Sequence, residues 1–322
     1  YKMAISNTGK LVREGIIRLT PMHPETSDQL NELQYVPQLT QEYLLYLQSG
    51  FQPRPDFGRA FPATWVTTGL DWDHLVLDAR TRESIDEIMR WVEYGKALIE
   101  TNPMFNVSYP CLFYGPPGTG KSLTAKLIGK KYNKDVFRVD LSMIVSKYIG
   151  ETEKNLGELF ARAEHAEVVL LFDEADAMFG KRTDVKDSND RFANQQTNYL
   201  LQRIEAFDGI VLLTSNSRAR FDSAFTRRLD SILEFPNPAP EERRALWLAH
   251  LGDAHALDAA AINRLAVACD LAGGHIRNVT LAARAISHNE AIGWVSLIQA
   301  TAAEYRKLGK QMPAALSVGP GG

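Results

Sequence analysis

A glycine-rich stretch, "GPPGTGKS" at Gly115–Ser122, follows a short apolar run and precedes a helical pattern. Glycines at such positions let backbone N–H groups turn inward around phosphates, and the N-terminus of the next helix adds partial positive charge. The lysine of such a loop reaches the β- and γ-phosphates, and the hydroxyl after it ligates Mg²⁺. The stretch therefore predicts a Walker A loop that binds ATP, with Ser122 as a metal ligand. The residues expected to contact the nucleotide are Gly115, Pro116, Pro117, Gly118, Thr119, Gly120, Lys121, Ser122 and Leu123.

Two acids, Asp173 and Glu174, follow a second apolar run in "VVLLFDEAD". A carboxylate at the tip of a buried strand can hold Mg²⁺, and a second carboxylate beside it can orient the attacking water. Acids in this place could instead cap the next helix. In combination with the loop at Gly115–Ser122, the acids predict a site for nucleotide hydrolysis in which Asp173 ligates the metal and Glu174 and Lys121 are catalytic.

Two adjacent arginines, Arg227 and Arg228, precede the apolar stretch "SILEF". A guanidinium keeps its charge in proteins, so each arginine needs an anion or open water. They could be solvated side chains paired with Asp222 or Asp230, and pairs of that sort contribute little. From these residues alone, the identity of the anion stays open.

The composition is typical of a soluble globular protein, because 45% of the 322 residues are apolar and 23% are charged. The net charge of −3 disfavours a dominant electrostatic hold on nucleic acid or on an anionic membrane. Cys111 and Cys269 lie far apart, without metal-type spacing. No apolar run approaches the roughly 18 residues that a membrane helix needs. We therefore expect a cytoplasmic protein without a membrane partner, and, since residue 1 is Tyr, a trimmed piece of a longer chain.

Short continuous apolar runs alternate with helical patterns from Asp71 onward. Strands that are buried on both faces have this pattern. The fold class expected is α/β: a P-loop NTPase parallel sheet covered by helices, followed by a small all-helical lid domain. The expected strands are 111–114, 136–140, 168–172, 210–214 and 232–235.

The chain divides into five expected segments. Residues 1–49 have no readable motif, although Gln38–Leu47 spaces apolar residues like one face of a helix. Residues 50–70 are rich in Gly and Pro and predict a linker, although their aromatic side chains are costly to leave in water. The remaining segments are 71–236, the large nucleotide-binding domain; 237–310, the lid domain; and 311–322, a disordered tail.

In the order of these motifs, the chain from about Asp71 to Leu308 resembles the AAA family, the ring-forming branch of P-loop ATPases. The resemblance implies a homo-oligomeric ring, a hexamer. "IVLLTSN" is similar to the family's sensor 1, which implies that Asn216 positions the attacking water. "AFTRRLDSILEFPNP" is similar to a segment at the subunit edge, which implies that Arg227 and Arg228 reach the γ-phosphate of the neighbouring protomer as arginine fingers.

The resemblance also implies contacts to the nucleotide from outside the loop. "GGHIRNV" opens a helix of the lid, and Arg277 in it resembles a sensor 2 arginine, although the core AAA clade has a Gly-Ala pair and no arginine here. His275 is expected to be a surface residue at the helix start. "GLDWDHLVLD" resembles the family's adenine-binding segment loosely, which places Leu75 and Val76 beside the base unless they are ordinary core residues.

"SKYIGETEKNL" resembles the axial pore loop of AAA unfoldases and remodellers. An aromatic side chain on a glycine hinge can wedge against an extended peptide, which suits a motor that pulls polypeptide. In the alternative interpretation, the aromatic and aliphatic residues pack as a pair beside the first turn of a helix. The residues concerned are Lys147, Tyr148, Ile149 and Gly150.

The expected function is Mg-ATP hydrolysis in a ring, coupled to remodelling, unfolding, assembly or disassembly of a protein client through an axial pore. A second hypothesis is an ATP-dependent assembly switch that docks without threading, with the docking encoded in residues 1–49. A third is a nucleic-acid motor, which the aromatic pore triplet and the lack of a nucleic-acid-binding motif disfavour. The sequence around the motifs most resembles that of bacterial and phage-derived AAA ATPases, some of which are encoded beside contractile, phage-tail-like injection particles. This resemblance implies tail, sheath or effector proteins as clients.

Overall fold

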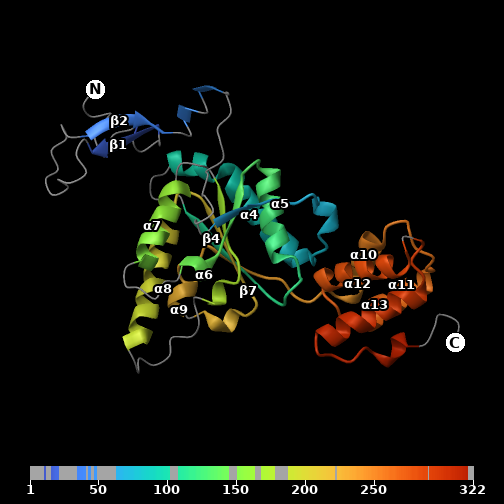
Figure 1. Cartoon of the computed structure of the whole chain (residues 1–322). Helices are drawn as coiled ribbons and strands as arrows, with labels where there is room; N and C mark the ends of the chain where they lie inside the picture. Colours follow the sequence, from blue (N-terminus) through green and yellow to red (C-terminus); the bar gives the residue numbers. More distant parts are fainter. Residues whose placement is uncertain are drawn as a thin grey trace.

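The structure is a computed structural model in which a helix-covered sheet is followed by a separate helical bundle at the C-terminal end (Figure 1). Its long described segments hold the sheet and the bundle, and short ones lie near the N-terminus. The described residues are 11, 16–21, 35–40, 43–44, 47–48, 63–101, 108–144, 151–163, 168–177, 188–221, 223–288 and 290–317.

The central sheet has six strands in the order β3-β5-β6-β7-β4-β8. Neighbouring strands from β5 to β8 in this order run parallel, and β3 at the edge runs antiparallel to β5. Strands β6 and β7 are buried along their whole length, which explains why they are continuous apolar runs in the sequence. The predicted parallel-dominated α/β fold is confirmed. The strands are β3 Ala63–Val66, β4 Tyr109–Tyr114, β5 Val136–Val139, β6 Val169–Phe172, β7 Ile210–Ser215 and β8 Ser231–Glu234.

Helices cover both faces of this sheet, with α7 and α8 on one side and α4 and α5 on the other (Figure 1). Alternate residues of a strand therefore enter different cores: Leu170 packs on the α7 and α8 side, and Leu171 packs on the α4 and α5 side. Among the described residues, no helix is both long and apolar enough to span a bilayer. The helices of this part are α4 Ala79–Thr101, α5 Lys121–Lys131, α6 Leu141–Ile144, α7 Glu151–Ala163, α8 Ser188–Ala206 and α9 Ser223–Thr226, with short 3₁₀ turns η2 Trp72–His74, η3 Ala175–Ala177 and η4 Arg218–Arg220.

Strand β3 differs from the expected linker, because it lies inside residues 50–70. Its register pairs Ala63 with Val139, and the indole Nε1 of Trp65 donates a hydrogen bond to Asp135 Oδ1 at 2.8 Å. A four-residue edge strand with two exposed side chains has too short an apolar pattern to be recognised between glycines and prolines. The linker prediction is therefore wrong for residues 63–66.

Near the N-terminus, β1 Ile17–Pro21 and β2 Tyr35–Leu39 form an antiparallel pair. Gln38 pairs with Arg18 in this ladder, so the helical face predicted from Gln38 to Leu47 begins within a strand. The pairing partner comes from a distant part of the chain, and periodicity within a short window cannot reveal it.

The C-terminal bundle has its own apolar core, which includes the buried side chains of Trp247 and Tyr305. Helix α10 begins at Pro240, and the carboxylate of Glu242 accepts a hydrogen bond from the backbone N–H of Ala239 at 2.7 Å. Leu316 is fully buried in the same core, so the predicted disordered tail is wrong for residues 311–317. The helices are α10 Pro240–Leu251, α11 Ala259–Ala268, α12 Gly273–Ile286 and α13 Trp294–Lys307, followed by the 3₁₀ turn η5 Ala314–Leu316.

Candidate nucleotide-binding site

The glycine-rich loop begins where β4 ends and runs into α5. Three of its glycines, Gly115, Gly118 and Gly120, have φ values of 144°, 80° and 105°. Residues with a side chain rarely adopt this region, so the glycines are required by the loop's shape. At Gly115 the space is also closed, because a Cβ there would lie 2.0 Å from the carbonyl oxygen of Phe235.

A Gly115→Ala substitution is expected to destabilise the fold by more than about 1 kcal/mol, because it adds a backbone clash to an unfavourable φ. Equilibrium unfolding in denaturant would measure the loss. Gly309→Ala is the matched control, since Gly309 has a φ of 68° with open space around it. Equal losses in the two variants would show that the contact with Phe235 has no energetic weight.

The ammonium group of Lys121 lies inside the loop. Its Nζ donates hydrogen bonds to the carbonyl oxygens of Gly115 at 2.6 Å and Pro116 at 2.8 Å, and to Asn216 Oδ1 at 3.4 Å. Burial lowers the pKa of Lys121, and the negative charges of Asp173 and Asp176 oppose that shift. The predicted Walker A lysine and the predicted sensor asparagine are thus brought together.

The two predicted acids lie at the end of β6, beside the loop. Ser122 Oγ donates a hydrogen bond to Asp173 Oδ1 at 3.0 Å, and the hydroxyl of Thr214 donates to the same oxygen. The same hydroxyl accepts a bond from the backbone N–H of Glu174 at 3.1 Å. Glu174 has a φ of 53°, which is uncommon for a residue with a side chain, and its carboxylate is exposed. Thr214, which no motif in the sequence marks, therefore positions both acids.

Asp173 and Ser122 suit a magnesium ion that is shared with a nucleotide. Both offer hard oxygen atoms, and Mg²⁺ commonly takes only one or two ligands from protein, with phosphates and water completing the shell. Within the part of the chain that is described, no group of three or more His, Cys, Asp or Glu residues could hold a metal by itself. The donor set thus fits a metal that arrives with the nucleotide.

The segment before α4 lies between the loop and the bundle. Leu75 is buried, and a Cβ at Gly120 would lie 2.7 Å from Leu75 Cδ1. Val76 packs against the apolar core of the bundle. Contact of these two side chains with adenine stays a prediction, because a core role explains the same packing.

Helix α12 of the bundle touches the loop directly. The backbone N–H of Gly274 donates to the carbonyl oxygen of Gly118 at 2.8 Å. His275 is half-buried beside Gly118, and its Nδ1 lies 2.9 Å from Glu304 Oε1, so its expected place on the surface is wrong. Arg277 is exposed. Burial lowers the pKa of His250, and the positive charges of Arg277 and His74 lower it further.

Arg227 and Arg228 lie at the opposite edge of the sheet from the loop. The backbone N–H of Asp230 donates to the carbonyl oxygen of Pro110, near the start of β4, whereas the loop begins at Gly115 beyond its end. Five residues of extended strand span about 17 Å. The two arginines therefore do not face the phosphate loop of their own chain.

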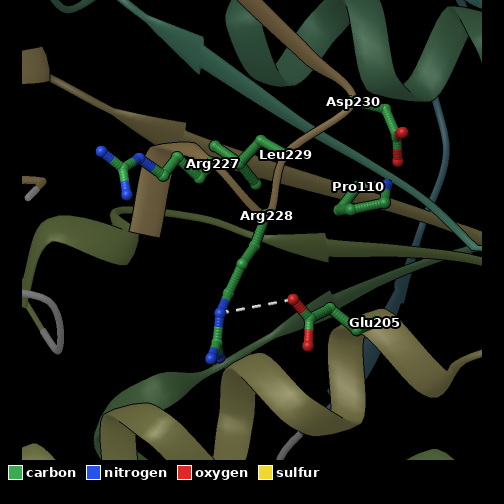
Figure 2. Close-up of a pocket in the computed structure, with 6 residues that line it drawn as sticks. All are labelled: Pro110, Glu205, Arg227, Arg228, Leu229 and Asp230. Carbon is green, nitrogen blue, oxygen red and sulfur yellow. Dashed lines mark ion pairs between the residues drawn. The ribbon is translucent and has the colours of Figure 1, made fainter. Parts of the chain in front are cut away.

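A pocket of about 320 Å³ lies beside these arginines (Figure 2). Arg228 Nε lies 3.4 Å from Glu205 Oε1, and each side chain is 37% exposed. Figure 2 shows the carboxylate of Asp230 turned away from Arg228, and burial raises the pKa of Asp230. Asp222, the other acid considered as a partner, lies outside the described residues. The pocket is lined by Pro110, Glu205, Arg227, Arg228, Leu229 and Asp230.

The predicted pore loop lies outside the described residues, which end at Ile144 and resume at Glu151, where α7 begins. The roles expected for this stretch therefore stay predictions. They concern Lys147, Tyr148, Ile149 and Gly150.

Comparison with known proteins gives matches over the same part of the chain. Residues 111–237 match the family described as "ATPase family associated with various cellular activities (AAA)". Proteasome-activating nucleotidase 2 of Haloferax volcanii is 34% identical over 177 residues, and the match covers 52% of this chain and 43% of that protein. The 26S proteasome regulatory subunit 10B homolog A of Arabidopsis thaliana is 34% identical over 146 residues, which covers 43% of this chain and 37% of that protein.

A further relative from Arabidopsis thaliana, Protein Suppressor of K(+) transport growth defect 1, is 35% identical over 146 residues, with 44% of this chain and 34% of that protein covered. The chain thus spans less than half the length of each of these relatives. The matched region contains the loop, both acids, Asn216 and the two arginines. Together with the geometry at the carboxyl edge of the sheet, these matches show that residues 111–237 are similar in sequence to the AAA family of ATPases.

Proposed function

We propose that this chain hydrolyses Mg-ATP in a ring, a hexamer, and couples hydrolysis to the unfolding or remodelling of a protein client through an axial pore. The observation that carries the proposal is the division of the site between two edges of one sheet. Lys121 and Glu174 lie at the carboxyl edge, whereas Arg228 lies in the same pocket as Pro110 at the other edge, and Pro110 is about 17 Å from Gly115 along β4. A catalytic arginine in that position serves the nucleotide of a neighbouring copy.

Within this proposal each residue has one task. Lys121 exchanges the carbonyl oxygens of its loop for phosphate oxygens, and Glu174 accepts a proton from the attacking water that Asn216 helps to place. Ser122 and Asp173 would hold Mg²⁺, which neutralises phosphate charge when bound. Arg228 of the neighbouring copy stabilises the charge that develops on the transferred phosphoryl group.

The names of the relatives support a protein as the client. One is a proteasome-activating nucleotidase and another is a regulatory subunit of the 26S proteasome. These relatives give no support to components of phage-tail-like particles as clients, so the proposal names none. Nothing in the described residues favours a nucleic-acid motor.

A second candidate is an ATP-dependent assembly switch. It is favoured by the hydrogen bond from Gly274 to the carbonyl oxygen of Gly118, because this bond ties the helical bundle to the loop that binds phosphate. Occupancy of the loop could then change the position of the bundle without any threading. A Glu174→Gln protein, which should bind ATP without hydrolysing it, separates the two candidates.

Threading predicts that Tyr148→Ala keeps its ATPase rate within about twofold of wild type and loses client unfolding, because the role proposed for Tyr148 is to grip the client and not to bind the nucleotide. A fluorescent protein with an unstructured tail is a suitable probe, and loss of its fluorescence measures unfolding. Tyr148→Phe, which retains the aromatic ring, is the control and should unfold the probe. Unfolding by Tyr148→Ala at the wild-type rate would remove the pore from the proposal.

A further inference from the structure

The start of α12 is packed against the phosphate loop more closely than most residues would allow. A Cβ at Gly274 would lie 3.0 Å from the Cα of Gly118, and the backbone N–H of Gly274 already donates to the Gly118 carbonyl. The next residue, His275, presents its ring to the same place, because a Cβ at Gly118 would lie 3.6 Å from His275 Cδ2. One imidazole therefore flanks the loop that holds phosphate.

The ring of His275 is held from its other side by α13. Its Nδ1 lies 2.9 Å from Glu304 Oε1, and Asn278 Nδ2 donates to the same oxygen at 3.3 Å. Burial alone would raise the pKa of Glu304, but the bonds from His275 and Asn278 and the charge of Lys307 outweigh it and lower the pKa. An ionised carboxylate only accepts hydrogen bonds, so Nδ1 carries a proton. Nε2, which is bonded to Cδ2, is the nitrogen on the side of the loop.

Helical geometry sets His275 and Arg277 on different sides of α12. Successive residues turn by about 100°, so two residues separate the side chains by about 200°. His275 is half-buried beside Gly118, whereas Arg277 is exposed and its charge acts on His250 of α10. The residue of this helix that lies against the phosphate loop is the histidine.

We propose that His275 is a nucleotide-binding residue whose Nε2 donates a hydrogen bond to a phosphate oxygen, while Glu304 positions the ring through Nδ1. The inference rests on the proposed function in so far as the loop must bind a nucleotide. A phosphate oxygen is only an acceptor, so Nε2 is the donor in this contact. The contact runs from Glu304 through His275 to the phosphate, and it fastens the bundle to the loop when nucleotide is bound.

Two substitutions of His275 test the two ring nitrogens one at a time. The amide nitrogen of Asn lies near the place of Nδ1, and that of Gln lies near the place of Nε2. The dissociation constant of fluorescently labelled ADP, measured with the full chain, should rise about tenfold in His275→Asn and stay within about threefold in His275→Gln. The dissociation constant of Glu304→Gln should lie between those of the two variants, because this substitution keeps a hydrogen-bond acceptor but removes the charge that fixes the ring.

His288→Asn is the matched control, since His288 is exposed beyond the far end of α12, about 20 Å from His275 along the helix axis. Its binding should equal that of wild type. Thermal unfolding without nucleotide checks that each variant is folded, and His275→Gln provides the second variant should His275→Asn unfold early.

Three results would overturn the inference. Wild-type binding by His275→Asn would show that no phosphate contact exists. If His275→Gln binds labelled ADP more weakly than His275→Asn, the ring contributes only through its hydrogen bond to Glu304. A larger loss of ADP affinity in Arg277→Ala than in His275→Asn would show that Arg277, and not His275, contacts the phosphate. If the wild-type chain itself binds no labelled ADP, the proposed function fails as well, and this outcome differs from the other three.

Discussion

A Glu174→Gln protein is expected to bind ATP about as tightly as wild type and to hydrolyse it at least about 100-fold more slowly. The carboxylate is exposed at the end of β6, and its backbone is anchored by the hydroxyl of Thr214. We expect a general base in this position to contribute to proton transfer in the transition state and little to binding, and Lys121 in the neighbouring loop to contribute to both. Phosphate release at saturating ATP and equilibrium binding of labelled ATP would measure the two effects separately.

Glu83→Gln is a suitable control for this variant, because Glu83 is exposed on α4 and lies outside the site. It should hydrolyse ATP at the wild-type rate. The biological readout then decides between the two candidate functions. A motor stops when hydrolysis stops, so client unfolding should be lost. Full function of Glu174→Gln in the presence of ATP would favour the assembly switch.

The arrangement of the glycine-rich loop and the two acids could be predicted because its geometry is local. In Gly115–Ser122 a strand, a loop and a helix follow one another, so the order of residues alone brings the backbone N–H groups and Lys121 together. The same holds for Asp173 and Glu174 at the end of β6. Continuous apolar runs predicted five strands of the sheet, because a strand that is covered on both faces needs no polar residue.

Thr214 is missed because its role depends on the order of strands in the sheet. Only the pairing of β6 with β7 brings its hydroxyl to Asp173 and to the backbone of Glu174. In the sequence it is a threonine at the end of an apolar run, which is ordinary for a strand. The signal in the sequence that could have found it is a hydroxyl side chain at the end of an apolar run, two positions before Asn216.

The other predictions that differ from the structure were wrong for the same reason, because they depend on contacts between residues far apart in the sequence. Strand β3 exists because β5 offers its edge, and Leu316 is ordered because the bundle has room for it. His275 follows the pattern of a solvent-facing residue at the start of a helix, and only the approach of α12 to Gly118 gives it a phosphate loop as a neighbour. Local pattern carries no information about which surface an element meets.

Because the proposed site is divided between the two edges of the sheet, we expect a second large loss of ATPase activity, from a substitution far from the loop. Arg228→Ala is expected to lower the ATPase rate about 1,000-fold, although the loop and both acids of the same chain are untouched. Lys121→Ala should be inactive as well, because it lacks the phosphate contact. ATPase activity per protomer is measured for each variant, for equal mixtures of the two, and for wild type over a wide range of protein concentration. Arg244→Ala is the control, since Arg244 is exposed on α10 and its Nε bonds to Asn263.

Complementation follows from where the two residues lie. A Lys121→Ala subunit still offers Arg228 to its neighbour, and an Arg228→Ala subunit still has an intact nucleotide site. In a head-to-tail ring of randomly mixed subunits, about a quarter of the interfaces combine one intact site with one intact arginine. The mixture should therefore recover up to about a quarter of wild-type activity, and wild-type activity per protomer should rise with concentration as rings assemble. No recovery, together with activity that is independent of concentration, would show that the arginine acts within its own chain or not at all. The separation of about 17 Å along β4 between Pro110, which lies beside Arg228, and Gly115 would then have to be closed by a movement of the chain, and the assembly switch would become the leading function.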